Sequence, residues 1–221
     1  MKSRATTKPL STSKRIYGCM PGFSGKSKTL AALVLEYQKS QEPESEKTWN
    51  SQKSLLEAYR ELSDLKTSIL NASFAHDLVG KRYRNGQERP TPKRHGHQWR
   101  LKKADMEKAL MQLRSKISKV KAYKLFEEIH ECVWTICSPI NGLGKLYIYD
   151  TALRIGSFLR LMPKRVYLQA GALAGARALG LDVKNSPLPV EDFPEALRIL
   201  KAHEIEDFLC IYKDHLTKFK S

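Results

Sequence analysis

Long apolar runs are absent from this chain of 221 residues. None approaches the ~18 residues that a transmembrane helix needs, so a membrane-spanning protein is not expected. Cysteines are scarce too: there are four, none of them in a Cys-x-x-Cys pair or beside histidines at zinc-finger spacing. We therefore predict reduced thiols in a cytoplasmic protein, with no metal site and no iron–sulfur cluster.

Acidic residues are the second shortage. The 23 Asp and Glu stand against 39 Lys and Arg, which leaves a net charge of +16. An excess of this size favours an anionic partner, with nucleic acid ahead of an acidic membrane surface. No acid precedes Glu36, so residues 1–26 are expected to form a flexible basic N-terminal arm. The same composition fits an organellar transit peptide, which is the alternative to a cytoplasmic location.

A glycine-rich stretch, GFSGKSKT at residues 22–29, is similar to a nucleotide-binding P-loop. That motif needs a glycine five residues before Gly25, where this chain has Met20. The strand that should precede the motif is missing as well, so no nucleotide cofactor is predicted. Residues 27–48 are expected instead to form a short helix, capped by Ser27, and an acidic linker.

Alternation of polar and apolar residues, the pattern of a half-buried strand, is also absent. Apolar residues recur instead at steps of three and four, which is the spacing of one helical face. This spacing predicts helices at about residues 49–70, 104–120, 122–137 and 145–161, and a last one from His203. The predicted fold class is therefore all-α, with residues 49–219 as a single domain. The 145–161 helix is apolar almost all round, apart from Asp150, Arg154 and Ser157, and is expected to be central and buried.

Residues 81–103 form a basic segment with nine Lys or Arg and one acid. Two prolines exclude a helix across it, and aromatic residues flank the charges. Such a segment can follow a phosphate backbone and stack on a base; the alternative is a solvated loop with Trp99 anchored in the core. His95 and His97 lack a third ligand, so no metal is predicted here. The cations predicted to bind nucleic acid are Lys81, Arg82, Arg84, Lys93, Arg94 and Arg100.

A Gly-x-Gly turn, from Gly142 to Gly144, comes immediately before the central helix and is followed by Lys145. Glycines at a helix N-terminus leave backbone N–H groups without partners, and the helix dipole adds a partial positive charge. Both effects favour an anion. We therefore predict that Gly142, Gly144 and Lys145 hold a phosphate of the nucleic acid.

Residues 126–181, taken together, resemble the helix-hairpin-helix DNA glycosylase superfamily. Members of that family have a Gly-x-Gly hairpin between two helices, as at residues 142–144 here, and a later helix that ends near Leu-Gly-Leu, as at residues 179–181. The resemblance implies a helical fold with a helix-hairpin-helix central element that binds a phosphate. It also implies that the usual chemistry is missing, because Gln169 stands at the position of the catalytic Asp and Leu146 at that of the lyase Lys.

Three functions are compatible with this sequence. The first, which we favour, is a non-catalytic nucleic-acid-binding protein without cofactors. The second is an enzyme acting on nucleic acid, a degenerate relative of the glycosylases, with Asp150, Arg154 and Gln169 as candidate catalytic residues. Asp150 and Arg154 lie one helical turn apart, so a structural ion pair explains them more simply. The third function is a protein-interaction module with a basic face.

Overall fold

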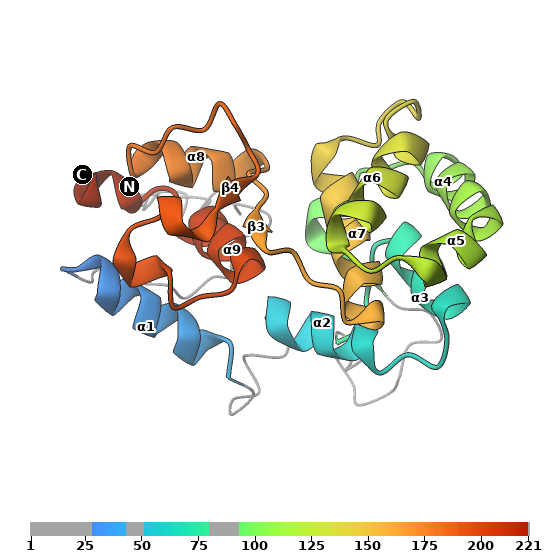
Figure 1. Ribbon diagram of the computed structural model, residues 1–221, viewed down its shortest axis with the longest axis horizontal. Coiled ribbons are helices and arrows are strands. Elements are labelled where there is room, and N and C mark those ends of the chain that lie inside the picture. Colours follow the sequence, from blue (N-terminus) through green and yellow to red (C-terminus); the bar gives the residue numbers. More distant parts are fainter. Residues whose placement is uncertain (1–27, 43–50, 80–92, 221) are drawn as a thin grey trace, which may run out of the picture.

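The computed structural model describes residues 28–42, 51–79 and 93–220, and most of this part of the chain is helical (Figure 1). Its α-helices are α1 (Leu30–Ser40), α2 (Gln52–Arg60), α3 (Leu65–Ser73), α4 (Lys103–Ser115), α5 (Ile117–Ala122), α6 (Phe126–Cys137), α7 (Lys145–Leu159), α8 (Ala170–Ala178) and α9 (Ala202–Tyr212). Short 3₁₀ helices are η1 (Gly96–Gln98), η2 (Val190–Asp192), η3 (Glu195–Leu197) and η4 (Leu216–Phe219). Among the described residues, no helix is long and apolar enough to cross a membrane.

Strands are confined, in the described ranges, to two short antiparallel pairs. One pair is β1 (His76–Asp77) with β2 (Lys93–Arg94), and the other is β3 (Arg165–Val166) with β4 (Leu188–Pro189). Two-stranded pairs of this length cannot bury an apolar face of their own, so the helices supply the core. The predicted all-α fold class is confirmed.

Two of the predicted helices are each divided in the structure. The helix expected over 49–70 is α2 and α3, because the Asp64 carboxylate accepts hydrogen bonds from the backbone N–H (2.9 Å) and the hydroxyl (2.8 Å) of Thr67. Asp64 is therefore an N-cap that begins a new helix. The helix expected over 104–120 is α4 and α5, which meet at Lys116.

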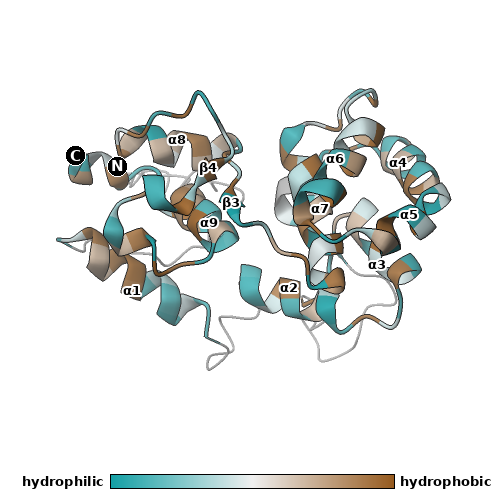
Figure 2. Ribbon diagram, viewed as in Figure 1, coloured by the Kyte–Doolittle hydropathy of each residue, from teal (hydrophilic) through white to brown (hydrophobic). Residues whose placement is uncertain are grey.

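The helices pack around two apolar cores that lie side by side in Figure 1. We call α2 to α7 the first lobe, and α1, α8 and α9 with β3 and β4 the second lobe. The helices carry both hydrophobic and hydrophilic residues, as expected where one helical face is buried and the other faces solvent (Figure 2). The chain crosses between the cores at residues 166–168: Val166 and Leu168 are buried in the second core, and Tyr167 in the first.

Helix α1 belongs to the second core, although it is far from α9 in the sequence. Its N-cap is Thr29, whose hydroxyl accepts a hydrogen bond from the first turn at 3.2 Å, and not Ser27 as predicted. Tyr37 packs edge-on against Phe208, with ring centroids 5.8 Å apart, and donates a hydrogen bond to Asp207 Oδ2 at 3.0 Å. A helix expected to stand outside the domain therefore helps to close its second core.

Helix α7 lies at the centre of the first core, as predicted, and packs against α2, α3 and α6. Two of its buried hydroxyls hold neighbouring helices. Tyr147 donates to the carbonyl of Ser73 in α3 at 2.8 Å, and Ser157 donates to that of Leu56 in α2 at 2.6 Å. Because a buried hydroxyl without a partner is costly, these bonds fix α7 against α2 and α3.

Candidate phosphate-binding turn and its surroundings

The turn between α6 and α7, residues 138–144, places the predicted glycines at the surface. Ile140 and Leu143 are buried in the first core, and the N–H of Leu143 donates to the carbonyl of Ile140 at 3.1 Å. Gly142 and Gly144 are exposed. Gly142 has a φ of +92°, a left-handed conformation that favours glycine. The two buried anchors therefore hold the turn in place while its glycines expose the backbone.

Gly144 is the N-cap of α7, with a φ of −80° and a ψ of 178°, the extended values usual for that position. No side chain among the described residues caps this helix. A Cβ added at Gly144 would meet none of their heavy atoms within 4 Å. Lys145 follows and is exposed. The start of this helix of 15 residues therefore offers N–H donors, a positive dipole end and a cation to an anion.

The start of α4 lies next to this turn. A Cβ added at Gly142 would come within 3.9 Å of Oδ2 of Asp105, in the first turn of α4. Lys108 partly neutralises that carboxylate, with its Nζ 3.4 Å from Asp105 Oδ1. Just before α4, the side-chain amide of Gln98 donates to Asp150 Oδ2 on α7 at 2.9 Å. The described end of the basic segment and the turn therefore flank the N-terminal half of α7.

The structure describes only half of the cations that we predicted in the basic segment. Those outside the described residues are Lys81, Arg82 and Arg84. Lys93 and Arg100 are exposed. Arg94 is engaged within the segment, because its Nη1 donates to the carbonyls of Trp99 (3.1 Å) and Leu101 (2.6 Å). Arg94 therefore fixes the backbone of this segment, and Lys93 and Arg100 are the cations that face solvent.

Trp99 is exposed and its neighbour Gln98 is buried, which is the reverse of what a core anchor at Trp99 would require. Trp99 is 54% exposed. Gln98 can be buried without losing a hydrogen bond, because its side-chain amide donates to Asp150. The core-anchor alternative for Trp99 is therefore wrong, and Gln98 anchors the segment.

Of the three candidate catalytic residues, Asp150 and Arg154 form the predicted ion pair. Arg154 Nη2 lies 3.6 Å from Asp150 Oδ2, and the side chains are 3% and 17% exposed respectively. Within the described residues, Nε and Nη1 of Arg154 make no hydrogen bond. Gln169 lies on another element, as the N-cap residue of α8, and its side chain makes no cap hydrogen bond there. The structure thus brings together two of the three candidates.

Tyr147 and Tyr149, two tyrosines of α7, point in different directions. Residues two apart on a helix are separated by ~200° around its axis. Tyr147 bonds to α3, whereas Tyr149 stacks on Tyr167 with ring centroids 5.3 Å apart and meets Phe126 edge-on at 6.2 Å. Burial raises the pKa of the Tyr149 hydroxyl well above 10, so it stays protonated. These side chains build the core of the lobe rather than a common site.

A buried carboxyl group that we did not predict lies on α9. Burial, and then the nearby carboxylates of Asp207 and Asp150, raise the pKa of Glu206 well above its usual value. One turn earlier, burial and two nearby cations lower the pKa of His203 from 6.5 to about 4. Asp150 belongs to α7, so these groups lie where the two lobes meet. Glu206 follows the buried Ala202 by four residues, so both lie on the same face of α9. This spacing is the sequence signal that could have predicted the burial of Glu206.

A separate hollow of about 420 Å³ lies along α5 and α6. Its lining mixes the cations of Lys116 and Lys119 with the carboxylates of Glu128 and Glu131, so it has no strong preference for a ligand of one charge. It also contains Cys132. In the part of the chain that the structure describes, no three His, Cys, Asp or Glu side chains are grouped as metal ligands.

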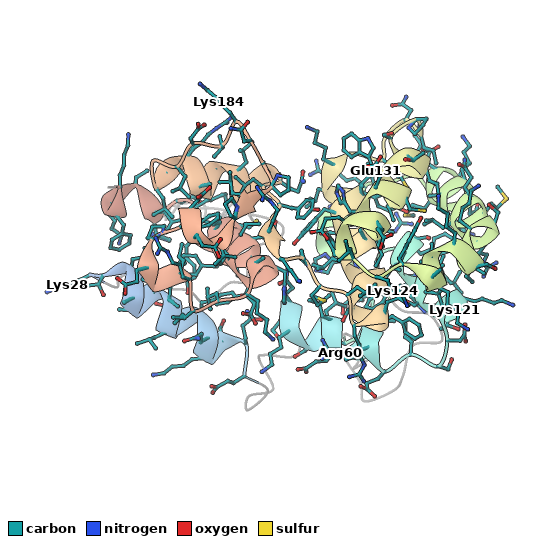
Figure 3. All side chains as sticks on the ribbon, in the orientation of Figure 1. Lys28, Arg60, Lys121, Lys124, Glu131 and Lys184 are labelled. Atoms are coloured by element: carbon teal, nitrogen blue, oxygen red, sulfur yellow. The ribbon has the colours of Figure 1, made fainter. Side chains whose placement is uncertain are left out.

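Exposed lysines occur on both lobes. Figure 3 labels Lys28 and Lys184 on the second lobe and Lys121 and Lys124 on the first, with Lys28 and Lys121 at opposite ends of the molecule. The positive charge therefore does not by itself select one binding face. Comparisons with protein-family models, with curated protein sequences and with solved structures found no match to this chain.

Proposed function

We propose that this protein binds nucleic acid without catalysing a reaction on it, and that the 138–144 turn holds a phosphate. The observation that carries the proposal is the exposed start of α7, where Gly144 leaves open space and Lys145 adds a positive charge. Aligned N–H donors and a lysine favour a phosphate over a neutral ligand, because each of these hydrogen bonds is assisted by charge.

The surroundings support an extended anion rather than a single small one. Arg100 and Lys93 are exposed on the segment that leads to α4, and α4 begins beside the turn. Cations at several places along a surface suit a polymer that carries a phosphate at every nucleotide. Asp105 opposes this attraction locally, although its pairing with Lys108 reduces the effect. The remaining charge excess attracts the polymer from a distance.

A binding role also fits the resemblance to the helix-hairpin-helix glycosylases. Gln169 carries an amide, which cannot act as the carboxylate that their chemistry needs. Leu146 carries no amine where the lyase members have a lysine. Asp150 is engaged by Arg154 and Gln98, and these contacts suit a structural role. We therefore propose phosphate binding without the glycosylase or lyase reaction.

The proposal can be tested by placing a competing carboxylate at the phosphate position. Gly144→Asp should stabilise α7, because aspartate is a favoured N-cap and interacts well with the helix dipole, by about 0.5–1 kcal/mol. The same substitution should abolish binding of labelled oligonucleotides, measured by fluorescence anisotropy. Gly144→Asn has nearly the same shape without the charge, so it should bind more weakly than the wild type and more tightly than Gly144→Asp.

A second test removes the charge of Lys145 and uses Lys124, just before α6, as its control. Lys145→Gln should reduce the slope of log affinity against log salt by about 0.9 for duplex or about 0.7 for single strands. Lys124→Gln makes the same charge change before the other end of α6, a helix of 12 residues that spans roughly 18 Å at 1.5 Å per residue. It should change the slope much less than Lys145→Gln does, because Lys124 contributes only to the long-range attraction. If the wild type binds no oligonucleotide at low salt, or if Gly144→Asp binds as well as the wild type, the proposal is wrong.

A further inference from the structure

Trp99 is held on a fixed backbone at the edge of the first lobe. The carbonyls of Trp99 and Leu101 both accept hydrogen bonds from Arg94. The N–H of Leu101 donates in turn to the carbonyl of Gln98 at 3.1 Å, and Gln98 is buried and bonded to Asp150. These bonds stiffen the chain on both sides of Trp99, although the residue itself is 54% exposed.

A lone exposed apolar residue needs no explanation, since such residues are common on protein surfaces. Trp99 differs in its surroundings. The guanidinium of Arg100 lies 5.8 Å from the centroid of its ring, and the exposed Lys102 and Lys103 follow. The other tryptophan that the structure describes, Trp134, packs against the first core. An aromatic ring among cations, on a rigid backbone, is the arrangement that binds the base and the phosphate of one nucleotide together.

The exposed face of an indole ring can stack on a nucleobase only if that base presents a face of its own. In a duplex each base face is covered by the next base pair, whereas an unpaired base leaves its face open. The contact with Arg100 would remain useful in the complex, because the guanidinium can reach a phosphate while the ring stacks. The partner that suits Trp99 is therefore a strand with unpaired bases.

We infer that Trp99 is a stacking platform for an unpaired base, and that this protein prefers single-stranded nucleic acid to duplex. This inference rests on the proposed function: the turn at 138–144 holds a phosphate, and Trp99 supplies the preference for a single strand. Stacking of one base on an aromatic side chain corresponds to roughly 5- to 150-fold in affinity.

The test compares binding of a single-stranded oligonucleotide and of the blunt duplex that contains it, by fluorescence anisotropy across a salt series. Trp99→Ala should weaken binding of the single strand by roughly 5- to 150-fold and leave duplex binding unchanged. The salt slope should not change, because the ring contacts no phosphate. Trp99→Phe should retain most of the affinity. Arg100→Gln should instead lower the slope for the single strand by about 0.7.

A matched control is Met111→Ala on the neighbouring α4. Met111 is also a large exposed apolar residue, 65% exposed, and its replacement changes no charge. It should leave binding of both oligonucleotides unchanged. The inference is wrong if Trp99→Ala weakens single-strand and duplex binding equally, if it has no effect, or if the wild type prefers duplex.

Failure of this inference can be distinguished from failure of the proposed function. If the wild type binds nucleic acid, loses binding in Gly144→Asp and is unaffected by Trp99→Ala, the turn is the binding site and the stacking role is wrong. If the wild type binds neither oligonucleotide, both proposals are wrong. Circular dichroism of each variant should match that of the wild type, because Trp99 is exposed and Gly144 has open space around it.

Discussion

Replacing Asp150 by Asn should destabilise the protein because it leaves Arg154 as a buried charge. The pair is separated by 3.6 Å, which corresponds to about 4–5 kcal/mol at an effective dielectric constant of ~20. Water reaches the partly exposed Asp150 and screens some of this attraction, and Gln98 can still bond to an asparagine. We therefore expect a loss of about 2–4 kcal/mol in the free energy of unfolding. The double variant Asp150→Asn with Arg154→Met should recover much of it, because the unpaired charge is removed.

The chain offers a matched control in Lys103 and Glu107. This pair has the same i, i+4 spacing and nearly the same separation, 3.5 Å, but both of its side chains are largely exposed. Glu107→Gln should therefore cost only about 0.3–0.5 kcal/mol. Urea unfolding followed by circular dichroism and by tryptophan fluorescence measures both variants, and agreement of the two signals supports a two-state analysis.

The reasoning is refuted if Asp150→Asn and Glu107→Gln cost the same within about 0.5 kcal/mol, which is the usual size of a surface effect. Burial would then not have strengthened the Asp150–Arg154 pair. A further result would change the functional proposal as well. If Asp150→Asn kept its stability but abolished a reaction on nucleic acid, Asp150 would be catalytic.

Four other predictions concern packing, backbone strain and pH. Gly175→Ala should destabilise the protein by about 1–3 kcal/mol in urea unfolding despite its better helix propensity, because the added Cβ would collide with the carbonyl oxygen of Leu209 in α9. Arg160→Gly should stabilise it by about 0.5–1 kcal/mol in the same assay, because Arg160 is exposed and has a φ of +59°. The lowered pKa of His203, about 4 against 6.5, means that its contribution to stability is present above pH 6.5 and is lost as the pH falls towards 4. Unfolding of His203→Asn should therefore depend less on pH in that window. The raised pKa of Glu206 has the opposite sign, so its contribution is present below about pH 4.5 and is lost as the pH rises, and Glu206→Gln should flatten that loss.

Helices and their buried faces could be predicted because their spacing is a local property. Leu113, Phe126, Ile205 and Phe208 lie within helices that the spacing predicted, and all four are buried. Each lies three or four residues from another apolar residue, so the neighbouring sequence alone determines the stripe. The central position of α7 followed from the same pattern, since few of its faces are polar.

Features that depend on distant parts of the chain could not be predicted in this way. The packing of Tyr37 on Phe208 joins the first described helix to the last α-helix, and no local pattern indicates it. The pKa of Glu206 on α9 is raised in part by Asp150 on α7, which is far from it in the sequence. The break at Asp64 is different, because an Asp whose carboxylate can accept from the residue three positions later, here Thr67, is a local N-cap signal. We missed it because the apolar spacing continues on both sides of Asp64.

For the proposed function, the location of positive charge matters more than its amount. Attraction at long range sums over both lobes, so Lys28 and Lys121 at opposite ends of the molecule contribute to it alike. Contact with a phosphate is short-ranged and needs donors at a fixed place, which the start of α7 provides at Gly144. Because Ile140 and Leu143 hold that turn in the core, its geometry does not depend on which surface lysines are present. Loss of distant lysines should therefore slow association, whereas a change at Gly144 should shorten the life of the complex.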